Sequence, residues 1–423
     1  MIRKTLSLGL LGFAFLTCVH AQDYAITNAK VWTGSETGTL EQATVLVQDG
    51  RIAALGPGLS VPAGIESVDA EGQWLTPGIF SAFSRTGLVE VGAEDSTNDT
   101  RASGTHFSAS LRAADGFNPA ATTLDVTRLE GVTRLAVAPS TSNNLIAGQG
   151  FLASTSGAPN SITESRAFTY IDMGEGGADL AGGSRSAAWA SLRGAFADAR
   201  GYPGRFITHS EGDSLNRADA QAFGSAVRGT QLMLINAHRA SDLRQIIALK
   251  RSNPNLNIAI VGADEGWMVA DELAEVAIAV IIDPFSNLPA SFAQLGATQR
   301  NAERLIQAGV TTAFAHLGDN GHQARLVLQV AGNAVANGLS RDQALHAIIT
   351  APAEIFALPD YGTLSPGALA DLVLWDGDPL EVMSAPSLVL IEGVPQSLES
   401  RQTKLRDRYM DLDESEKPLA YKR

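Results

Sequence analysis

The sequence is almost free of cysteine. Its only Cys is Cys18, among 423 residues, so the chain beyond the first 21 residues can form neither a disulfide bond nor a cysteine-ligated metal site. Long hydrophobic runs are also lacking. After the first 21 residues, no segment has the roughly 18 uninterrupted apolar residues that a membrane-spanning helix requires. A soluble mature protein without a membrane span is therefore expected.

Positive charge is scarce. The chain has 31 Lys and Arg against 45 Asp and Glu, a formal net charge of −14, and no basic block outside its ends. Nucleic acid is therefore excluded as an expected partner. Hydrophobic residues make up 45% and charged residues 18% of the sequence, which predicts a globular protein and excludes a disordered chain or a coiled coil.

The first 21 residues have the pattern of an export signal. Arg3 and Lys4 precede an apolar stretch over 6–16, and Val19-His20-Ala21 places a small residue before the expected cut. This pattern predicts a signal peptide at 1–21, a mature chain that begins near Gln22, and a periplasmic or secreted protein. The alternative, a lipoprotein anchored at Cys18, fits poorly because a small residue is needed before the cysteine.

Two β-rich ends flank a different middle. Short strand-like runs occupy 24–32, 44–48, 51–55 and 67–75, and return only at 371–375 and 388–391. The Asp49-Gly50 pair between two of these runs predicts a hairpin. The segment 395–423 is dense in charge, with Leu405 and Tyr409 at helical spacing. It is predicted to be either a solvated helix or an arm that contacts a partner.

The middle alternates strand and helix patterns. The predicted strands are 133–138, 231–237, 257–261, 279–282 and 311–315, and the predicted helices are 241–251, 267–277, 301–308 and 324–337. Ser340 and Gln343 have the spacing of a capping box for a further helix, while 90–119 and 174–185 are expected to be loops. Repeated strand and helix units require a parallel sheet, and a (β/α)8 barrel closes it most economically. An open doubly wound sheet is the alternative, although no Gly-x-Gly-x-x-Gly motif supports it.

Motifs at both ends resemble one known family. The first block comprises 45–56 (VLVQDGRIAALG), 68–70 (VDA) and 74–79 (WLTPGI); the second comprises 344–345, 349–350, 352–354, 362–364, Gly367 and 370–374 (ADLVL). Together they resemble the amidohydrolase superfamily in its imidazolonepropionase-like branch. The resemblance implies a (β/α)8 TIM-like barrel at 76–358 with a mono- or dinuclear metal site. It also implies a small β-sandwich domain formed from both chain ends, 22–75 and 359–394.

The metal ligands that the resemblance implies are mostly replaced. The first pair would be a His-x-His after Pro-Gly, but Phe83 and Arg85 stand at those positions, and an arginine would repel a cation. His238 falls on the strand-five ligand. The strand-six histidine would fall near Val261-Gly262 and is absent, and Asp319 stands a few residues late for the strand-eight aspartate.

The remaining histidines leave alternatives open. His238 is either a remnant of the metal site or a packed neutral histidine. A rebuilt site could also combine it with His316, His322 and Asp319, because loops after barrel strands share one face. His316 and His322 have the pattern of surface-loop residues, and His106, His209 and His346 lie in no motif.

Two classes of function are consistent with these residues. The first is a metal-free relative without cofactor, which binds a small-molecule ligand at Arg85 and His238 and supports an active amidohydrolase paralogue or forms a homo-oligomer. The second is a metal-dependent hydrolase of C–N bonds in a dipeptide or cyclic amide, with zinc at His238 in a non-standard site. A solute-binding protein is disfavoured, because the two chain ends are expected to join in one small domain.

Overall fold

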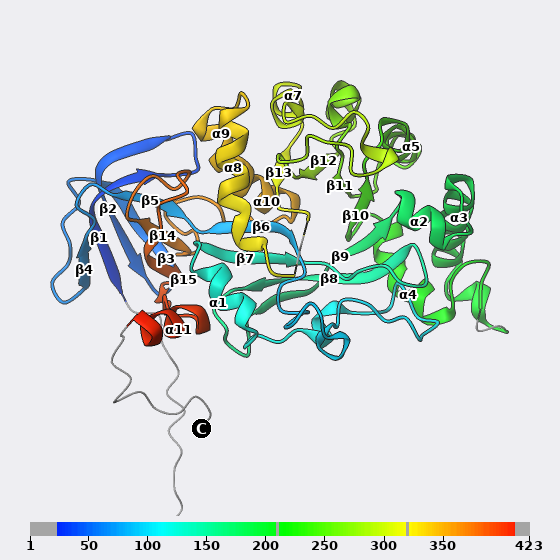
Figure 1. The fold of residues 1–423 in the computed structure, drawn as a ribbon, viewed down its shortest axis with the longest axis horizontal. Helices are drawn as coiled ribbons and strands as arrows, with labels where there is room; N and C mark the ends of the chain where they lie inside the picture. The colour runs from blue at the N-terminus through cyan, green and yellow to red at the C-terminus, as the bar shows by residue number, and fades with distance from the viewer. Residues whose placement is uncertain (1–22, 209–210, 319–320, 411–423) are drawn as a thin grey trace, which may run out of the picture.

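A computed structural model describes residues 23–208, 211–318 and 321–410 of the chain. Figure 1 shows a small β domain beside a larger body of strands and helices. The predicted signal peptide lies outside the described residues. Within those ranges, no helix combines the length and apolar character needed to cross a membrane.

The larger body is a nearly closed barrel of eight strands. In chain order, the strands are β6 (Ile79–Ser84), β7 (Val132–Val137), β8 (Ile146–Ser154), β9 (Ile162–Asp172), β10 (Leu232–Ala237), β11 (Ile258–Gly262), β12 (Ala279–Ile282) and β13 (Thr312–Phe314). They pair in this order, and β13 returns to lie against β6. The predicted barrel is confirmed.

One strand departs from the predicted alternation of strand and helix. β8 runs antiparallel to both β7 and β9, whereas the other neighbouring strands are parallel. A short turn joins β8 to β9, and no helix lies between these two strands. β10, β11 and β13 are thus the fifth, sixth and eighth strands by position, as the motif comparison assumed.

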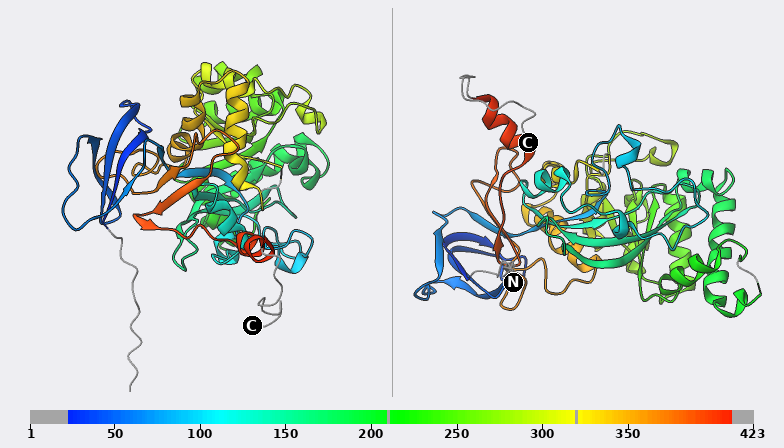
Figure 2. Two further views of the ribbon diagram at one scale, coloured as in Figure 1. Left: turned by 60° about the vertical axis from the view of Figure 1, so that its left-hand side comes forward. Right: turned by 90° about the horizontal axis from the view of Figure 1, so that it is seen from below.

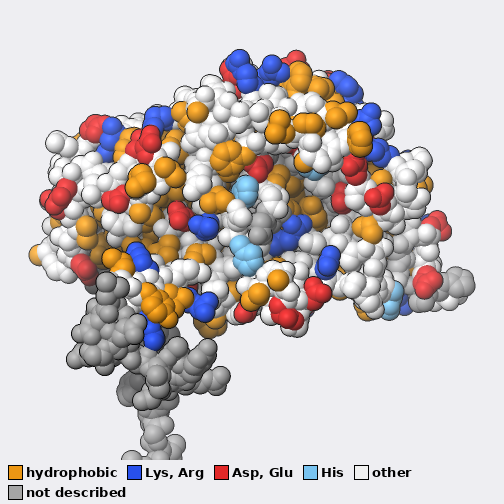
Figure 3. All heavy atoms as spheres, viewed as in Figure 1, with side chains coloured by type: hydrophobic (Ala, Val, Ile, Leu, Met, Phe, Trp, Pro, Cys, Tyr) orange, Lys and Arg blue, Asp and Glu red, His pale blue; other side chains and the backbone are white. Residues whose placement is uncertain are grey.

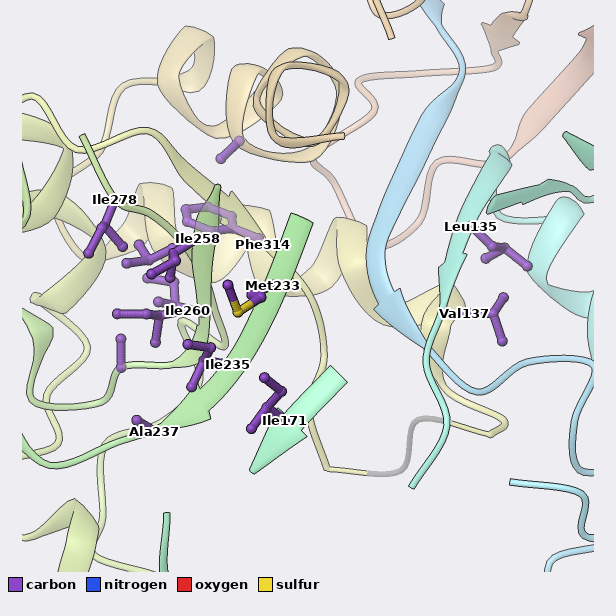
Figure 4. Packing of buried hydrophobic residues seen from close by; sticks show 14 of the residues in the cluster. Leu135, Val137, Ile171, Met233, Ile235, Ala237, Ile258, Ile260, Ile278 and Phe314 are labelled. Atoms are coloured by element: carbon purple, nitrogen blue, oxygen red, sulfur yellow. The ribbon is translucent and has the colours of Figure 1, made fainter. Parts of the chain in front are cut away.

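Helices cover the outside of the barrel. They are α1 (Thr122–Arg128), α2 (Glu175–Leu180), α3 (Arg185–Gly201), α4 (Arg217–Val227), α5 (Ala240–Ser252), α6 (Ala270–Glu275), α7 (Asn301–Gln307), α8 (Val327–Ala336), α9 (Arg341–Ile348) and α10 (Thr350–Ile355); a further helix, α11 (Arg401–Met410), belongs to the C-terminal segment. Alternate residues of β10 and β11, such as Met233, Ile235 and Ile260, point to one side and are buried there (Figure 4). Residues between them, such as Leu234 and Val261, belong to a separate buried cluster. Period-two alternation thus builds an outer and an inner core.

Most predicted helices are present. The predicted capping box forms at the start of α9, where Ser340 accepts from Gln343 and Gln343 reaches back. The helix predicted at 267–277 is instead split into a short 3-10 turn (Gly266–Met268) and α6. The segment 174–185, predicted as a loop, contains α2.

The small domain is one mixed sheet from both chain ends. Its strands are β1 (Tyr24–Trp32), β2 (Thr39–Gln48), β3 (Arg51–Pro57), β4 (Glu66–Asp69), β5 (Trp74–Pro77), β14 (Leu372–Trp375), β15 (Pro386–Ile391) and β16 (Val394–Pro395). The predicted hairpin is present: β2 and β3 pair on either side of Asp49 and Gly50, whose φ angles are 49° and 75°. Both angles suit a type I′ turn, which favours this residue pair.

The C-terminal segment ends in α11, which has no buried residue. Arg128 of α1 donates to the carbonyl of Ser397 (3.2 Å) and holds the preceding segment to the barrel. Figure 2 shows α11 projecting from the body of the protein. Residues 411–423 of the predicted tail lie outside the described residues.

Candidate functional site at the barrel mouth

His238 follows β10 and is joined to Asp264, which follows β11. Its Nδ1 atom hydrogen-bonds with the Asp264 carboxylate, which also accepts from Nε2 of Gln294 (2.8 Å). The two residues meet because the carboxyl ends of adjacent parallel strands lie at the same end of a barrel. His238 is therefore a fixed residue of the barrel mouth, with its ring partly exposed.

Gly262, at the end of β11, makes room for the His238 ring. Its φ is +100°, and a Cβ atom there would lie 2.5 Å from Cε1 of His238. Only glycine combines this backbone conformation with the absence of a side chain. The His238 ring, which follows β10, thus fills the space that a side chain at Gly262, at the end of β11, would need.

Asp264 is held as a carboxylate. Burial raises its pKa, but hydrogen bonds from His238, Ser286 and Gln294 and the nearby His238 ring outweigh burial, so the net pKa lies below its usual value. The adjacent Glu265 accepts from the backbone N–H groups of Ala240 (2.9 Å) and Gly296 (3.0 Å). These contacts fix the loops around His238.

Arg85 follows β6 and lies among aromatic side chains. Its guanidinium is 5.3 Å from the centre of the Phe83 ring, which packs 5.4 Å from the Tyr170 ring on β9. Arg85 also donates to the Tyr170 hydroxyl. Burial raises the pKa of Tyr170 to about 12, with Asp172 adding to the rise and Arg85 opposing it. Tyr170 is therefore a neutral phenol beside a permanent cation.

Asp172 and Asn236 join the Arg85 side of the mouth to the His238 side. Asp172 ends β9 and accepts from Nδ2 of Asn236 (3.0 Å) and from the backbone of Gly174 (2.8 Å). Asn236 lies two residues before His238. Polar residues of β6, β9, β10 and β11 thus follow one another across the barrel mouth.

The other histidines are spread over the molecule. Nδ1 of His316, after β13, lies 3.2 Å from Asp283 at the end of β12. His322 lies beside Gly92, His106 stacks on Phe107, and His346 of α9 packs on Trp32. His209 and Asp319 lie outside the described residues. Figure 3 shows histidine and basic side chains near the middle of one face of the protein.

The described residues at the mouth form no recognisable set of metal ligands. Across 23–208, 211–318 and 321–410, no three His, Cys, Asp or Glu side chains are grouped as metal ligands. Phe83 offers no donor, and the Arg85 guanidinium brings a positive charge. His238 keeps the carboxylate contact that a metal-binding histidine often has, but a hydrolytic zinc site needs about three protein ligands.

The sequence singled out Arg85 and His238 as candidate ligand-binding residues, but it did not predict the residues that contact them. Asp264, Tyr170, Asp172 and Gln294 were not proposed as site residues. A signal for Asp264 and Asp172 was present, because each carboxylate comes at the end of a buried strand, where barrel sites are built.

The chain is similar to several known proteins. Residues 24–75 match the NagA composite domain. The amidohydrolase tasK of Hapsidospora irregularis is 26% identical over 88% of this chain, and the match spans only 43% of tasK. The imidazolonepropionase of Maricaulis maris (strain MCS10) is 24% identical over 82% of this chain and 90% of its own length.

Solved structures share the fold. An amidohydrolase from Thermotoga maritima MSB8 superposes with a TM-score of 0.79 at 24% identity, covering 88% of this chain and 99% of its own. A prolidase complexed with N-methylphosphonate-L-proline has a TM-score of 0.56 at 17% identity, covering 88% of this chain and 99% of its own.

Proposed function

We propose that this chain, which is similar to an amidohydrolase and to imidazolonepropionases, is an exported member of the amidohydrolase superfamily without the metal-dependent activity. It uses the barrel mouth to bind a small molecule and supports an active amidohydrolase paralogue. A second copy of this chain is the other candidate partner.

The observation that carries the proposal is the position of Arg85. This guanidinium follows β6, where the resemblance implies a metal-binding histidine, and it is held by Phe83 and Tyr170. A cation there would face a permanent positive charge without a cluster of ligands among the described residues. The mouth therefore suits an anion better than a divalent cation.

The proposed ligand is a small carboxylate. The planar N–H groups of Arg85 match a carboxylate in charge and shape, and the neutral Tyr170 hydroxyl lies beside them. His238, with Nδ1 engaged by Asp264, presents Nε2 as a further polar contact. Arg85 and His238 are thus the proposed ligand-binding residues.

A specific observation favours a second candidate function. The His238–Asp264 pair has the arrangement in which a carboxylate orients a metal-binding imidazole. If further ligands come from Asp319 and its loop, the chain would be a zinc-dependent hydrolase of C–N bonds in a dipeptide or cyclic amide.

Purification from the exported fraction without chelators tests both candidates. The expected result is a mature chain that begins near Gln22, less than one zinc ion per chain, no hydrolysis of dipeptides or cyclic amides, and a co-purifying protein with an intact His-x-His. Removal of residues 401–423 should weaken that association, because α11 exposes Leu405 and Tyr409 (40% and 62%). A metal-loaded monomer that hydrolyses these substrates would establish the second candidate instead.

A further inference from the structure

A groove outside the barrel mouth runs along α8. It has a volume of about 330 Å³ and lies between α8, the loop 379–384 that precedes β15, Phe285 after β12, and Glu130 after α1. The buried side chains of Leu328 and Leu380 form its walls, and the more exposed Phe285 and Val382 stand at its rim. The size is that of a site for a small organic molecule.

Glu130 brings a negative charge to this groove, whose lining mixes apolar side chains with polar ones such as Gln329 and Asn333. It is partly buried, and within the described ranges its carboxylate has neither a hydrogen bond nor an ion pair. Burial raises its pKa, and Arg325, which lies nearby without forming an ion pair, lowers it less. The carboxylate is thus partly dehydrated at the edge of the groove, and an opposite charge there would offset the cost of its burial.

We propose that this groove binds an organic ammonium group, with Glu130 as its counter-ion and an alkyl or aryl body along Leu328 and Leu380. An ammonium would form an ion pair with the carboxylate, and its carbon chain would cover the apolar walls. The Phe285 ring at the rim can add a cation–π contact. A carboxylate ligand would meet repulsion from Glu130 and Glu381, and an apolar ligand would offer Glu130 no opposite charge.

Two sources can supply this chemistry, a free amine and a lysine side chain. Calorimetric titration should use n-pentylamine for the first and Nα-acetyl-lysine-N-methylamide for the second, with n-pentanol as the uncharged analogue. At least one of the two amines is expected to bind more tightly than n-pentanol, and the stronger binder identifies the source.

Substitution of the carboxylate decides the role of Glu130. Glu130→Gln should weaken amine binding by about tenfold or more, the effect of losing one charged hydrogen bond, and leave the binding of n-pentanol unchanged. Glu381→Gln, on the other side of the groove, is the matched control and should have a smaller effect.

Glu130→Gln should fold normally. Removing a carboxylate whose pKa is raised should stabilise the protein, more at pH 8 than at pH 4, since burial opposes only the ionised form. Equal amine affinity in Glu130→Gln and the unsubstituted protein, or no binding of either amine, would overturn the proposal.

Discussion

Two arginines on neighbouring barrel strands illustrate opposite uses of the same side chain. Arg134, in β7, is buried at the junction with the small domain, where Nε and Nη2 donate to Asp371 (2.7 and 3.0 Å) and Nη2 also donates to Glu392 (2.8 Å). Arg85, after β6, lies at the barrel mouth against the rings of Phe83 and Tyr170.

The difference lies in what compensates each charge. The charge of Arg134 is compensated by two carboxylates, those of Asp371 and Glu392. Asp371 lies where the chain passes from the barrel back into the small domain, directly before β14. Such a buried pair is costly to break, since the remaining charge loses its partner. Arg85 lies against the Phe83 and Tyr170 rings at the barrel mouth, a place suited to ligand contact, whereas Arg134 joins two domains.

The largest predicted effect is at Arg134. Arg134→Ala should lower the free energy of unfolding by about 3–5 kcal/mol, because Asp371 would remain buried without its cation. Urea unfolding followed by circular dichroism measures this change. Glu392→Gln is the control and should cost much less, since the Glu392 side chain is 53% exposed. A loss no larger for Arg134→Ala than for Glu392→Gln would contradict this comparison.

Much of the fold was predictable because its signals are local. Hydrophobic alternation marks β10 and β11, the Asp49-Gly50 pair marks a hairpin, and Ser340 with Gln343 marks the start of α9. β8 and β9 were both missed, although all nine residues of β8 are buried. Its Gly150 is required by the Phe168 ring, which an added Cβ would approach to 2.1 Å. A glycine often indicates a turn in a sequence, but Gly150 lies within a strand and makes room for a side chain 18 residues away.

The site was predictable only in part, for the same reason. Arg85 and His238 could be proposed as candidates because each lies in a motif with a recognisable spacing. The pairing of His238 with Asp264 joins residues 26 positions apart, and that of Arg85 with Tyr170 depends on the position of β9 in the barrel. Such pairings follow from strand order and are not encoded in any local pattern.

The second predicted effect is at Gly262. Gly262→Ala should lower the free energy of unfolding by about 2–4 kcal/mol, through a strained φ and contact with the His238 ring. Gly309→Ala is the matched control: its φ is +84°, but nothing lies within 4 Å of its added Cβ. Urea unfolding compares the two variants, and the NMR signals of His238 should shift only in Gly262→Ala. Equal losses in both would mean that the His238 ring can move aside.

The smallest effect on stability is predicted at Arg85, together with the clearest effect on binding. Arg85→Ala should lower the free energy of unfolding by only about 1 kcal/mol, because the side chain lies against aromatic faces at the barrel mouth and not at the junction of the two domains. N-acetylglycine should raise the melting temperature of the unsubstituted protein and leave that of Arg85→Ala unchanged. Arg85→Lys should keep part of the response, since it retains the charge but loses the planar pair of N–H groups that a carboxylate matches. Arg134 is too deeply buried to bind an added carboxylate. Any rise in melting temperature that remains in Arg85→Ala would therefore come from binding at another surface. That result would contradict the role of Arg85 in the proposed site.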